Sequence, residues 1–323
     1  VKQRQTVPND TEFPFQWHLQ IPALGNPAAM NLPNAWSLTT GNAVVVAVVD
    51  SGVRFDHPEL ASLGTVGPAA RLLPGYDLVS EVDVANDGNG RDPDASDPGD
   101  WITAGDTQTA LFDGCEVSDS SWHGTFIAGQ IAAATNNLAG IAGINWGARI
   151  LPVRVSGKCG ALVSDLLDGV RWAAGLPVAG LPVNANPARV INLSFGGDRA
   201  CSPAYQDTIN AATDAGALVV VAAGNAASAL TRPADCQRVM AVAAVRKDGA
   251  KTTYSSFGPQ VALSAPGGSD EAGGVNLLLS TVNNGATTPG LNGFGYKQGT
   301  SFAAPQAVGV ASLMLAVNDA LTP

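Results

Sequence analysis

Short apolar runs recur along the chain, and their pattern is the clearest structural signal in the sequence. Each run is nearly all apolar without polar alternation, which is typical of strands covered on both faces in a parallel sheet. The runs are residues 44–49, 149–155, 190–195, 217–223 and 239–245. Helical patterns occur over residues 124–134, 162–174, 203–215 and 301–317. Strands that alternate with helices predict an α/β fold built on a doubly wound parallel sheet.

The composition predicts one globular domain with a substantial core. The 323 residues are 46% hydrophobic and 14% charged, and no run approaches the roughly 18 consecutive apolar residues of a membrane span. No internal repeat, low-complexity tract or convincing linker divides the chain, so we expect residues 1–323 to form a single domain. The net charge of -10 argues against nucleic acid and anionic lipid as partners, because both bind basic faces.

Most of the negative charge lies in one segment, residues 77–119, which we call the acidic segment. It carries twelve acids and a single base, Arg91, so its local charge is -11. The segment is also rich in Gly and Pro and lies between two apolar stretches. We therefore expect a loop insertion on the surface rather than a separate domain.

Four cysteines are present, and none has the CxxC or CxxH spacing of a zinc site or a dithiol redox site. An even number at wide spacing fits two disulfides, which persist in oxidising compartments and indicate a secreted, extracellular protein. Four buried free thiols are the alternative. Residues 1–10 are polar without an apolar signal core, as in a mature form whose targeting segment has been removed.

Polar residues follow several of the apolar runs or begin the helical patterns. Asp50 follows the first run, Ser194 lies at the end of the third and Asn225 follows the fourth, while His123 and Ser301 open helical patterns. In doubly wound sheets, ligands bind at the carboxyl ends of strands and at helix N-termini, so these five positions should converge on one edge. Each residue alone is more often a cap or a turn residue.

Four short motifs contain these residues, and together they resemble the subtilisin-like serine proteases (subtilases). The motifs are VVDSGV around Asp50, HGTFIAG from His123, AAGN ending at Asn225, and GTSFAAP from Gly299 through Ser301. All four occur in the order found in that family. The resemblance covers the chain from about residue 8 to residue 315. It implies a three-layer α/β fold with helices on both faces of a mostly parallel sheet, and a secreted serine endopeptidase.

The resemblance assigns Ser301 as nucleophile, His123 as general base and Asp50 as its orienting carboxylate. A serine hydroxyl is a weak nucleophile until a neutral imidazole takes its proton, and a carboxylate must fix the tautomer of that imidazole. The order Asp, His, Ser is the subtilisin arrangement, and the GxSxG elbow of α/β-hydrolases is absent. The other histidines, His18 and His57, open no helical pattern, which leaves His123 as the base.

Two further positions on these motifs are informative. The resemblance makes the Asn225 amide and the Ser301 backbone N–H the donors to the oxyanion that forms during acyl transfer. The family commonly has a second histidine three residues after the catalytic one, where this chain has Phe126. That residue is outside the triad, so the departure should change local packing and leave the mechanism intact.

Relatives hold a peptide as an extended strand between two protein segments, and the resemblance places both in this chain. The segments are Gly160, Ala161 and Leu162, and Ser194, Phe195 and Gly196. The walls of the first specificity pocket would be Ser194 to Gly196 together with Ala222, Ala223 and Gly224, with Thr231 near the floor. Small residues without a carboxylate predict a preference for apolar P1 side chains over Lys or Arg. The alternative is that these glycines only serve tight turns. Relatives also carry a cis X-Pro bond where this chain has Arg232-Pro233.

The acidic segment offers oxygen ligands at the density that Ca²⁺ requires, about 6–8 per ion. The candidate ligands of a structural calcium are Asp83, Asp87, Asn89, Asp92, Asp94 and Asp97. It is no EF-hand, because Asp92 stands where that loop needs Gly, and a solvated acidic loop is the alternative. A second family site would use Asp10, Glu59 and the Asn137 loop, with Glu59 where many relatives have Asp.

The four cysteines allow three pairings, and we predict Cys115 with Cys159 and Cys201 with Cys236. Cys115 lies shortly before His123 and Cys159 just after the second apolar run, so both should be near the active-site edge; Cys201 begins a helix beside the segment with Cys236.

The expected partners are protein or peptide substrates and the N-terminal propeptide of a precursor, acting on a monomer. Two other functions remain: an inactive subtilisin-like binding module, and a secreted esterase. Casein hydrolysis separates the first from an active enzyme, and the ratio of peptide to ester cleavage separates the second.

Overall fold

A seven-stranded parallel sheet forms the centre of the protein. The computed structural model describes residues 5–65, 69–271 and 276–323. The strand order is β2-β3-β1-β4-β5-β6-β7, and all six neighbouring pairs are parallel. The strands are β1 Val45–Asp50, β2 Tyr76–Asp77, β3 Arg149–Arg154, β4 Val190–Leu193, β5 Leu218–Ala222, β6 Met240–Val245 and β7 Val261–Pro266. The five runs predicted as strands are β1, β3, β4, β5 and β6.

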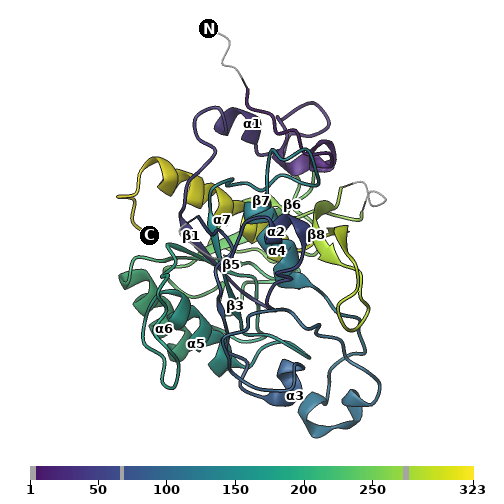
Figure 1. Cartoon of the computed structure of the whole chain (residues 1–323), viewed down its shortest axis with the longest axis vertical. Coiled ribbons are helices and arrows are strands. Elements are labelled where there is room, and N and C mark those ends of the chain that lie inside the picture. Colours follow the sequence, from purple (N-terminus) through teal and green to yellow (C-terminus); the bar gives the residue numbers. More distant parts are fainter. Residues whose placement is uncertain (1–4, 66–68, 272–275) are drawn as a thin grey trace.

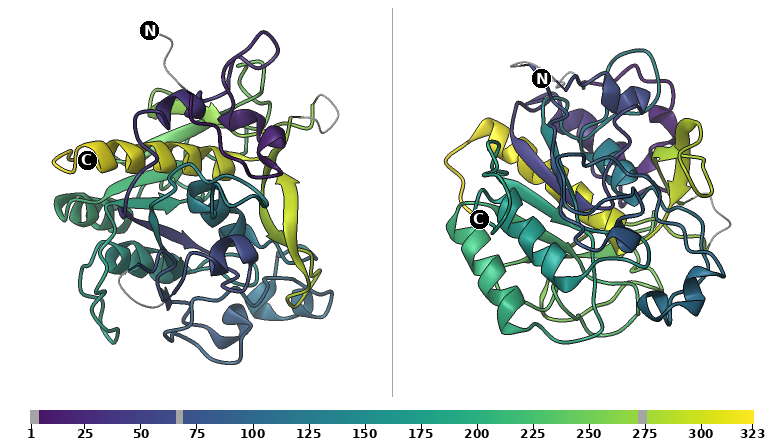
Figure 2. Two further views of the ribbon diagram at one scale, coloured as in Figure 1. Left: turned by 45° about the horizontal axis from the view of Figure 1, so that its top comes forward. Right: turned by 60° about the horizontal axis from the view of Figure 1, so that its bottom comes forward.

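Helices cover both faces of this sheet, which confirms the predicted three layers (Figures 1 and 2). The long helices are α4 His123–Ala132, α5 Val163–Ala173, α6 Pro203–Asp214 and α7 Thr300–Val317. On β1, Val46 and Val48 pack with α4 and α7, while Ala47 and Val49 pack with α5 and α6. Because both sets of side chains are buried, the strands read as continuous apolar runs.

Several elements were absent from the sequence prediction. They are β2 and β7 at the two edges of the sheet, the antiparallel pair β8 Leu278–Asn283 and β9 Asn292–Lys297, and the short helices α1 Leu32–Ala35, α2 Pro58–Ala61 and α3 Val82–Ala85. β2 has two residues, and β9 contains glycines and exposed side chains, so neither gives a strong pattern. β8 lies against α4, where Ser280 and Thr281 donate hydrogen bonds to helix carbonyls.

The helix α7 carries Ser301 and runs through the core. By length and composition α7 could cross a membrane, and among the described residues it is the one helix of which this is true. Its mean hydropathy is 1.5, and 67% of it is buried inside the protein. Because most of α7 is buried, it is a core helix of the folded protein. This burial explains its apolar composition, although the sequence has no unbroken apolar run of the length of a membrane span.

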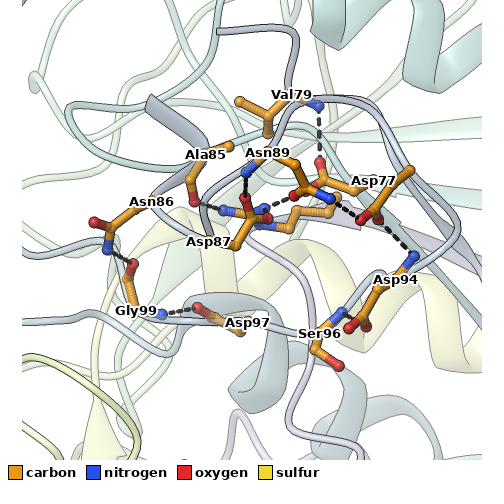
Figure 3. A network of polar contacts seen from close by, with 12 residues as sticks. Asp77, Val79, Ala85, Asn86, Asp87, Asn89, Asp94, Ser96, Asp97 and Gly99 are labelled. Atoms are coloured by element: carbon orange, nitrogen blue, oxygen red, sulfur yellow. Dashed lines mark hydrogen bonds and ion pairs between the residues drawn. The ribbon is translucent and has the colours of Figure 1, made fainter. Parts of the chain in front are cut away.

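The acidic segment is anchored to the sheet by Arg154, the last residue of β3. Its guanidinium is fully buried and donates to the carboxylates of Asp77 and Asp87 and to the carbonyl of Ala85. Asp77 belongs to the edge strand β2, next to Arg154 in the register. The segment also has a small apolar cluster of its own, formed by Val79, Val84, Ala85, Ile102 and Phe112. The acidic segment is therefore attached to the core by buried contacts of Arg154 and has buried side chains of its own, which a simple surface loop would lack (Figure 3).

Both disulfides have the predicted pairing. Cys115 pairs with Cys159 at a Cα separation of 5.8 Å, and Cys201 pairs with Cys236 at 5.2 Å. The first ties the acidic segment to the chain just before Gly160. The Arg232-Pro233 bond is cis, as predicted.

One histidine is buried in the N-terminal part of the protein. His18 is in the single turn of 3-10 helix Trp17–Leu19 and is 1% exposed. Neither of its ring nitrogens has a hydrogen-bond partner among the described residues. Burial lowers the pKa of His18 to about 3, so the folded protein holds it neutral.

The protein should therefore lose stability in acid through His18. Below pH 6.5 His18 binds a proton in the unfolded chain, whereas in the folded chain it stays neutral down to about pH 3. The free energy of unfolding therefore falls by up to about 1.4 kcal/mol for each pH unit between these two values. His18→Phe should flatten this dependence in urea unfolding measured from pH 7 to pH 4. An unchanged slope in the variant would show that His18 is not the titrating group.

Candidate active site

Asp50 and His123 form a hydrogen-bonded pair at the carboxyl end of β1. Asp50 is the last residue of β1 and is fully buried, and His123 is the first residue of α4. The distance from His123 Nδ1 to Asp50 Oδ1 is 2.7 Å, and the same oxygen accepts the N–H of Ser51 at 2.8 Å. A carboxylate at this position favours the tautomer with the proton on Nδ1 and leaves Nε2 free to accept one.

Two glycines lie where the start of α4 meets the turn after β1. Gly52 has a φ of +93°, which an L side chain rarely adopts. A Cβ on Gly124 would collide with the carbonyl oxygen of Gly52. Gly124 is therefore required by the close contact between this turn and the start of α4, and Gly52 by its own backbone conformation.

Ser301 lies in the first turn of α7, after the N-cap residue Gly299, whose φ is 147°. Its hydroxyl donates a long hydrogen bond of 3.4 Å to the carbonyl of Ser194, and Ser194 Oγ donates to the Ser301 carbonyl at 2.9 Å. No hydrogen bond joins Ser301 Oγ to His123 within the described ranges. The imidazole does pack on Phe302, the next residue, with ring centroids 5.1 Å apart. Loose contacts of this kind are common in sites without substrate.

Asn225 is held through its side-chain oxygen, and its amide NH₂ makes no hydrogen bond within the described part of the chain. Its Oδ1 accepts the backbone N–H of Thr300 at 2.9 Å and the Thr300 hydroxyl at 2.8 Å. Since the oxygen is fixed in this way, the nitrogen is the atom left to donate, beside the start of α7. Thr300 is fully buried and also accepts the N–H of Gly224 at 3.1 Å. Sequence reasoning missed this anchor, whose signal is its place between Gly299 and Ser301.

The two predicted substrate segments flank the Asp50 strand. β3 and β4 are the neighbours of β1, and the segments Gly160 to Leu162 and Ser194 to Gly196 follow their carboxyl ends. In the described structure, no hydrogen bond is made by four of their backbone N–H groups, those of Ala161, Leu162, Phe195 and Gly196. Such groups are available to an added extended strand.

The predicted pocket residues lie at the end of β5 and in the turn beyond it. Ala222 and Ala223 are buried, and Gly224 follows them with a φ of +100°. Thr231 Oγ1 donates to the carbonyl of Gly197 at 2.6 Å, which joins the turn to the segment after Gly196. The structure thus brings Thr231 near the chain that follows Ser194 to Gly196.

Asp97, one of the predicted calcium ligands, lies behind the catalytic pair instead. Its Oδ2 accepts the Ser51 hydroxyl at 2.8 Å, and its Oδ1 accepts the Gly99 N–H at 2.9 Å. Ser51 Oγ in turn accepts the N–H of Gly124 at 3.1 Å. Burial raises the pKa of Asp97 to about 7, with further help from the charge of Asp100. The structure does not group Asp97 with the other candidates.

The remaining candidates of the acidic segment are only partly gathered. Asp87, Asp92 and Asp94 each form a turn in which a side-chain oxygen accepts the N–H two residues on (Figure 3). Asn89 joins two of these turns, because its side-chain amide donates to Asp92 Oδ2 at 2.6 Å. Asp83 lies apart, in the first turn of α3. In the part of the chain that the structure describes, no three of these carboxylates have oxygens within 4.8 Å of one another.

Two other acids meet in a buried position. Asp10 and Glu59 are each 3% exposed, and both carboxylate oxygens of Asp10 accept the N–H of Asn136, at 3.0 and 2.8 Å. Glu59 Oε2 is buried with no partner among the described residues. Burial, and then the charge of Asp10, raise the pKa of Glu59 to about 8. The adjacent loop has positive φ at Asn136, Leu138 and Gly140. A cation among these oxygens would offset the charge of the two acids.

His57 corrects one detail of the sequence prediction, because it does begin a short helix. It is the N-cap of α2, and its Nδ1 accepts the Glu59 N–H at 3.2 Å. Its Nε2 lies 2.9 Å from the carbonyl of Gly293. Both nitrogens are engaged in the fold, which leaves His123 as the histidine of the site.

Comparisons with known proteins agree with this geometry. Residues 41–323 match the Subtilase family. An extracellular protease of Xanthomonas campestris pv. campestris is 46% identical over 321 residues, which are 98% of this chain and 51% of that protein. An extracellular basic protease of Dichelobacter nodosus is 39% identical over 326 residues, 99% of this chain and 50% of that protein. The chain thus spans about half the length of these curated relatives.

Solved structures show the same fold. Proteases from Pseudoalteromonas arctica superpose with a TM-score of 0.89 at 44% identity, covering 98% of this chain and 89% of that chain. A cold-adapted subtilisin-like serine proteinase superposes with a TM-score of 0.65 at 26% identity, covering 95% and 87%. Since the family match spans most of the chain and includes Asp50, His123 and Ser301, this protein belongs to the subtilase family.

Proposed function

We propose that this protein is a serine endopeptidase that hydrolyses peptide bonds through an acyl-enzyme. The observation that carries the proposal is the buried Asp50 paired with His123, with Ser301 in the first turn of α7 next to that imidazole. The names of the relatives, both extracellular proteases, support the same reading. An inactive binding module would not need this pair, and a secreted esterase would not need two strand-like segments beside it.

Substrate binding would use the free N–H groups on either side of β1. An extended peptide that lies between Gly160 to Leu162 and Ser194 to Gly196 can accept from them, so that its backbone gives affinity and its side chains give specificity. The pocket beside Ser194 to Gly196 has walls of Ala222, Ala223 and Gly224 and a floor near Thr231. Its small, uncharged residues favour apolar P1 side chains, and we expect broad specificity.

The chemical steps follow from the positions of the protons. Ser301 Oγ leaves the Ser194 carbonyl, gives its proton to His123 Nε2 and attacks the peptide carbonyl, while Asp50 stabilises the imidazolium. The new oxyanion accepts from Asn225 Nδ2 and from the Ser301 N–H, which has no intrahelical partner at the start of α7. His123 then returns the proton to the leaving amine, and water releases the acyl group by the same route.

We further propose that the protein is a single domain over residues 1–323, with residues 77–119 as an acidic insertion, and that it is secreted and monomeric. Extracellular relatives and two disulfides support secretion. An N-terminal propeptide of its own precursor is the expected partner besides protein substrates.

A structural calcium ion is also part of the proposal. The site that fits it best is formed by Asp10, Glu59 and the Asn136 to Gly140 loop. Glu59 has a buried oxygen with no partner among the described residues, and a cation would offset the charge of the two acids. In the acidic segment, Asp87, Asn89, Asp92 and Asp94 could hold a second ion, although Arg154 already neutralises Asp87. Calcium would supply charge compensation here and take no part in catalysis.

Ser301→Ala should abolish activity and leave the fold intact. The change removes the attacking oxygen but only a small, partly exposed group, so casein hydrolysis should fall by about 10⁶-fold while the melting temperature stays close to wild type. Phenylmethylsulfonyl fluoride should label Ser301, as read by mass spectrometry. Ser62→Ala, an exposed serine on α2's end, is the matched control. Labelling elsewhere, or residual activity in the variant, would refute the assignment.

Calcium should stabilise the protein mainly through Asp10 and Glu59. Saturation to about 100 times the dissociation constant adds about 2.7 kcal/mol, so the melting temperature should rise by several degrees over EDTA. Glu59→Gln should remove most of the rise in melting temperature. The matched variant Asp92→Asn should remove less of it. Asp92→Asn should also promote autolysis within residues 77–119 when EDTA is present. An equal response to Ca²⁺ in wild type and Glu59→Gln would place the ion elsewhere.

A further inference from the structure

The turn that leads into His123 is held from two sides by groups that the proposed mechanism does not use. Ser120 donates its N–H to the carbonyl of Ala286 at 2.7 Å, and Trp122 donates its indole N–H to the carbonyl of Gly285 at 2.8 Å. Both acceptors belong to the loop between β8 and β9. Ser121, between them, makes contacts of a different kind, because its partners are charged.

The backbone at this turn needs such support. Trp122 is the N-cap of α4 and has φ 49° and ψ 36°, a left-handed conformation that is unfavourable for a bulky residue. Its side chain gives no capping hydrogen bond. A conformation of this kind persists only where the surroundings hold it. Since His123 is the next residue, the direction of its imidazole depends on what holds Trp122 and Ser121.

Every polar group of Ser121 is engaged with a charged side chain. Its N–H donates to Asp100 Oδ1 at 2.5 Å and its hydroxyl to Asp100 Oδ2 at 2.6 Å. Its carbonyl accepts from the ammonium of Lys297. Asp100 comes from the acidic segment, and Lys297 is the last residue of β9, four residues before Ser301. Hydrogen bonds to charged groups are stronger than neutral ones, so this clamp should fix the turn tightly.

Phe126 provides the surface under the Lys297 ammonium. The ammonium lies 5.8 Å from the centroid of the Phe126 ring, which is fully buried one helical turn after His123. A cation is attracted to such a ring face. Burial lowers the pKa of Lys297, and the charges of Asp100, Asp50 and Asp97 oppose that effect. Phe126, which stands where the family resemblance leads one to expect a second histidine, thus contacts the ammonium that binds Ser121.

We propose that Asp100 and Lys297 are positioning residues for the general base, acting on His123 through Ser121. The inference rests on the proposed peptidase function and deepens it. Asp100 holds the donor side of the turn and Lys297 its acceptor side, so loss of either lets the turn relax and misplaces the imidazole relative to Ser301. Small misplacements of a catalytic group are costly, up to about 10²-fold for roughly 1 Å.

The same two residues place opposite charges on the two sides of Ser121, two residues before His123. The charged groups around the turn are Asp50 on β1, Arg54 after it, Asp97 and Asp100 in the acidic segment, Arg154 on β3 and Lys297 on β9. A cation disfavours the imidazolium and an anion favours it. Removal of Lys297 should therefore move the acid limb of kcat/KM to higher pH, and removal of Asp100 should move it to lower pH.

The test uses the whole chain with the variants Lys297→Met, Lys297→Arg and Asp100→Asn. We expect Lys297→Met and Asp100→Asn to lower kcat on a chromogenic peptide by about 10- to 100-fold with KM changed by less than about threefold. Their acid limbs should shift in opposite directions, and Lys297→Arg should restore most of kcat. Lys251→Met is the matched control, because Lys251 also donates to backbone carbonyls over a phenylalanine ring, that of Phe257, outside the site.

A purely structural clamp gives a different result. Melting temperatures would then fall in the variants while kcat and both acid limbs of the folded enzyme stayed at wild-type values, which would overturn the inference. If Lys297→Met fails to fold, Asp100→Asn decides by its kcat and its acid limb. Failure of the proposed function looks different again, because wild type itself would then not cleave the peptide.

Discussion

A buried carboxylate at the end of a central strand is the constraint on which the site depends. Asp50 is fully buried, and an unpaired charge there would be strongly unfavourable. The fold meets this cost by bringing the N–H of Ser51 and the imidazole of His123 to one oxygen of the carboxylate. The pairing brings the start of α4 against the turn after β1, where a Cβ on Gly124 would collide with the carbonyl oxygen of Gly52. The catalytic geometry and the packing of sheet on helix are therefore one arrangement.

The surrounding structure supports that arrangement in layers. Asp97 holds Ser51, and Ser51 holds the N–H of Gly124, so a chain of hydrogen bonds runs behind the pair. Arg154, next to Asp50 in the register, fixes the acidic segment that supplies Asp97. On the other side of the site, Thr300 fixes Asn225. The acidic segment, the carboxyl edge of the sheet and α7 thus meet at the triad. Some of the acids of the segment contact buried side chains, Asp97 that of Ser51 and Asp87 that of Arg154.

The sequence was sufficient for the parts of the fold that bury apolar side chains on both faces. β1 and α4 give clear patterns of apolar residues. The motifs around Asp50 and Ser301 are contiguous in the sequence, so they can be recognised without knowledge of the tertiary structure. β2 and β9 escaped prediction because a two-residue strand and a glycine-rich, half-exposed strand give no such pattern. The sequence groups Asp97 with the other acids of its run, because its buried partner Ser51, forty-six residues away, is known only from the structure. Thr300 and Lys297 were missed for the same reason, since their roles depend on tertiary neighbours.

The tautomer of His123, read by ¹⁵N NMR of the histidine side chains, tests most directly whether Asp50 orients the imidazole. Only three histidines are present, so His123 can be assigned with His18→Phe and a His57 variant. At a pH where the imidazole is neutral, we expect a proton on Nδ1 and none on Nε2. Asp50→Asn should shift the proton to Nε2, because an amide can donate to Nδ1. A wild-type imidazole protonated on Nε2, or a tautomer indifferent to Asp50→Asn, would contradict this role of Asp50.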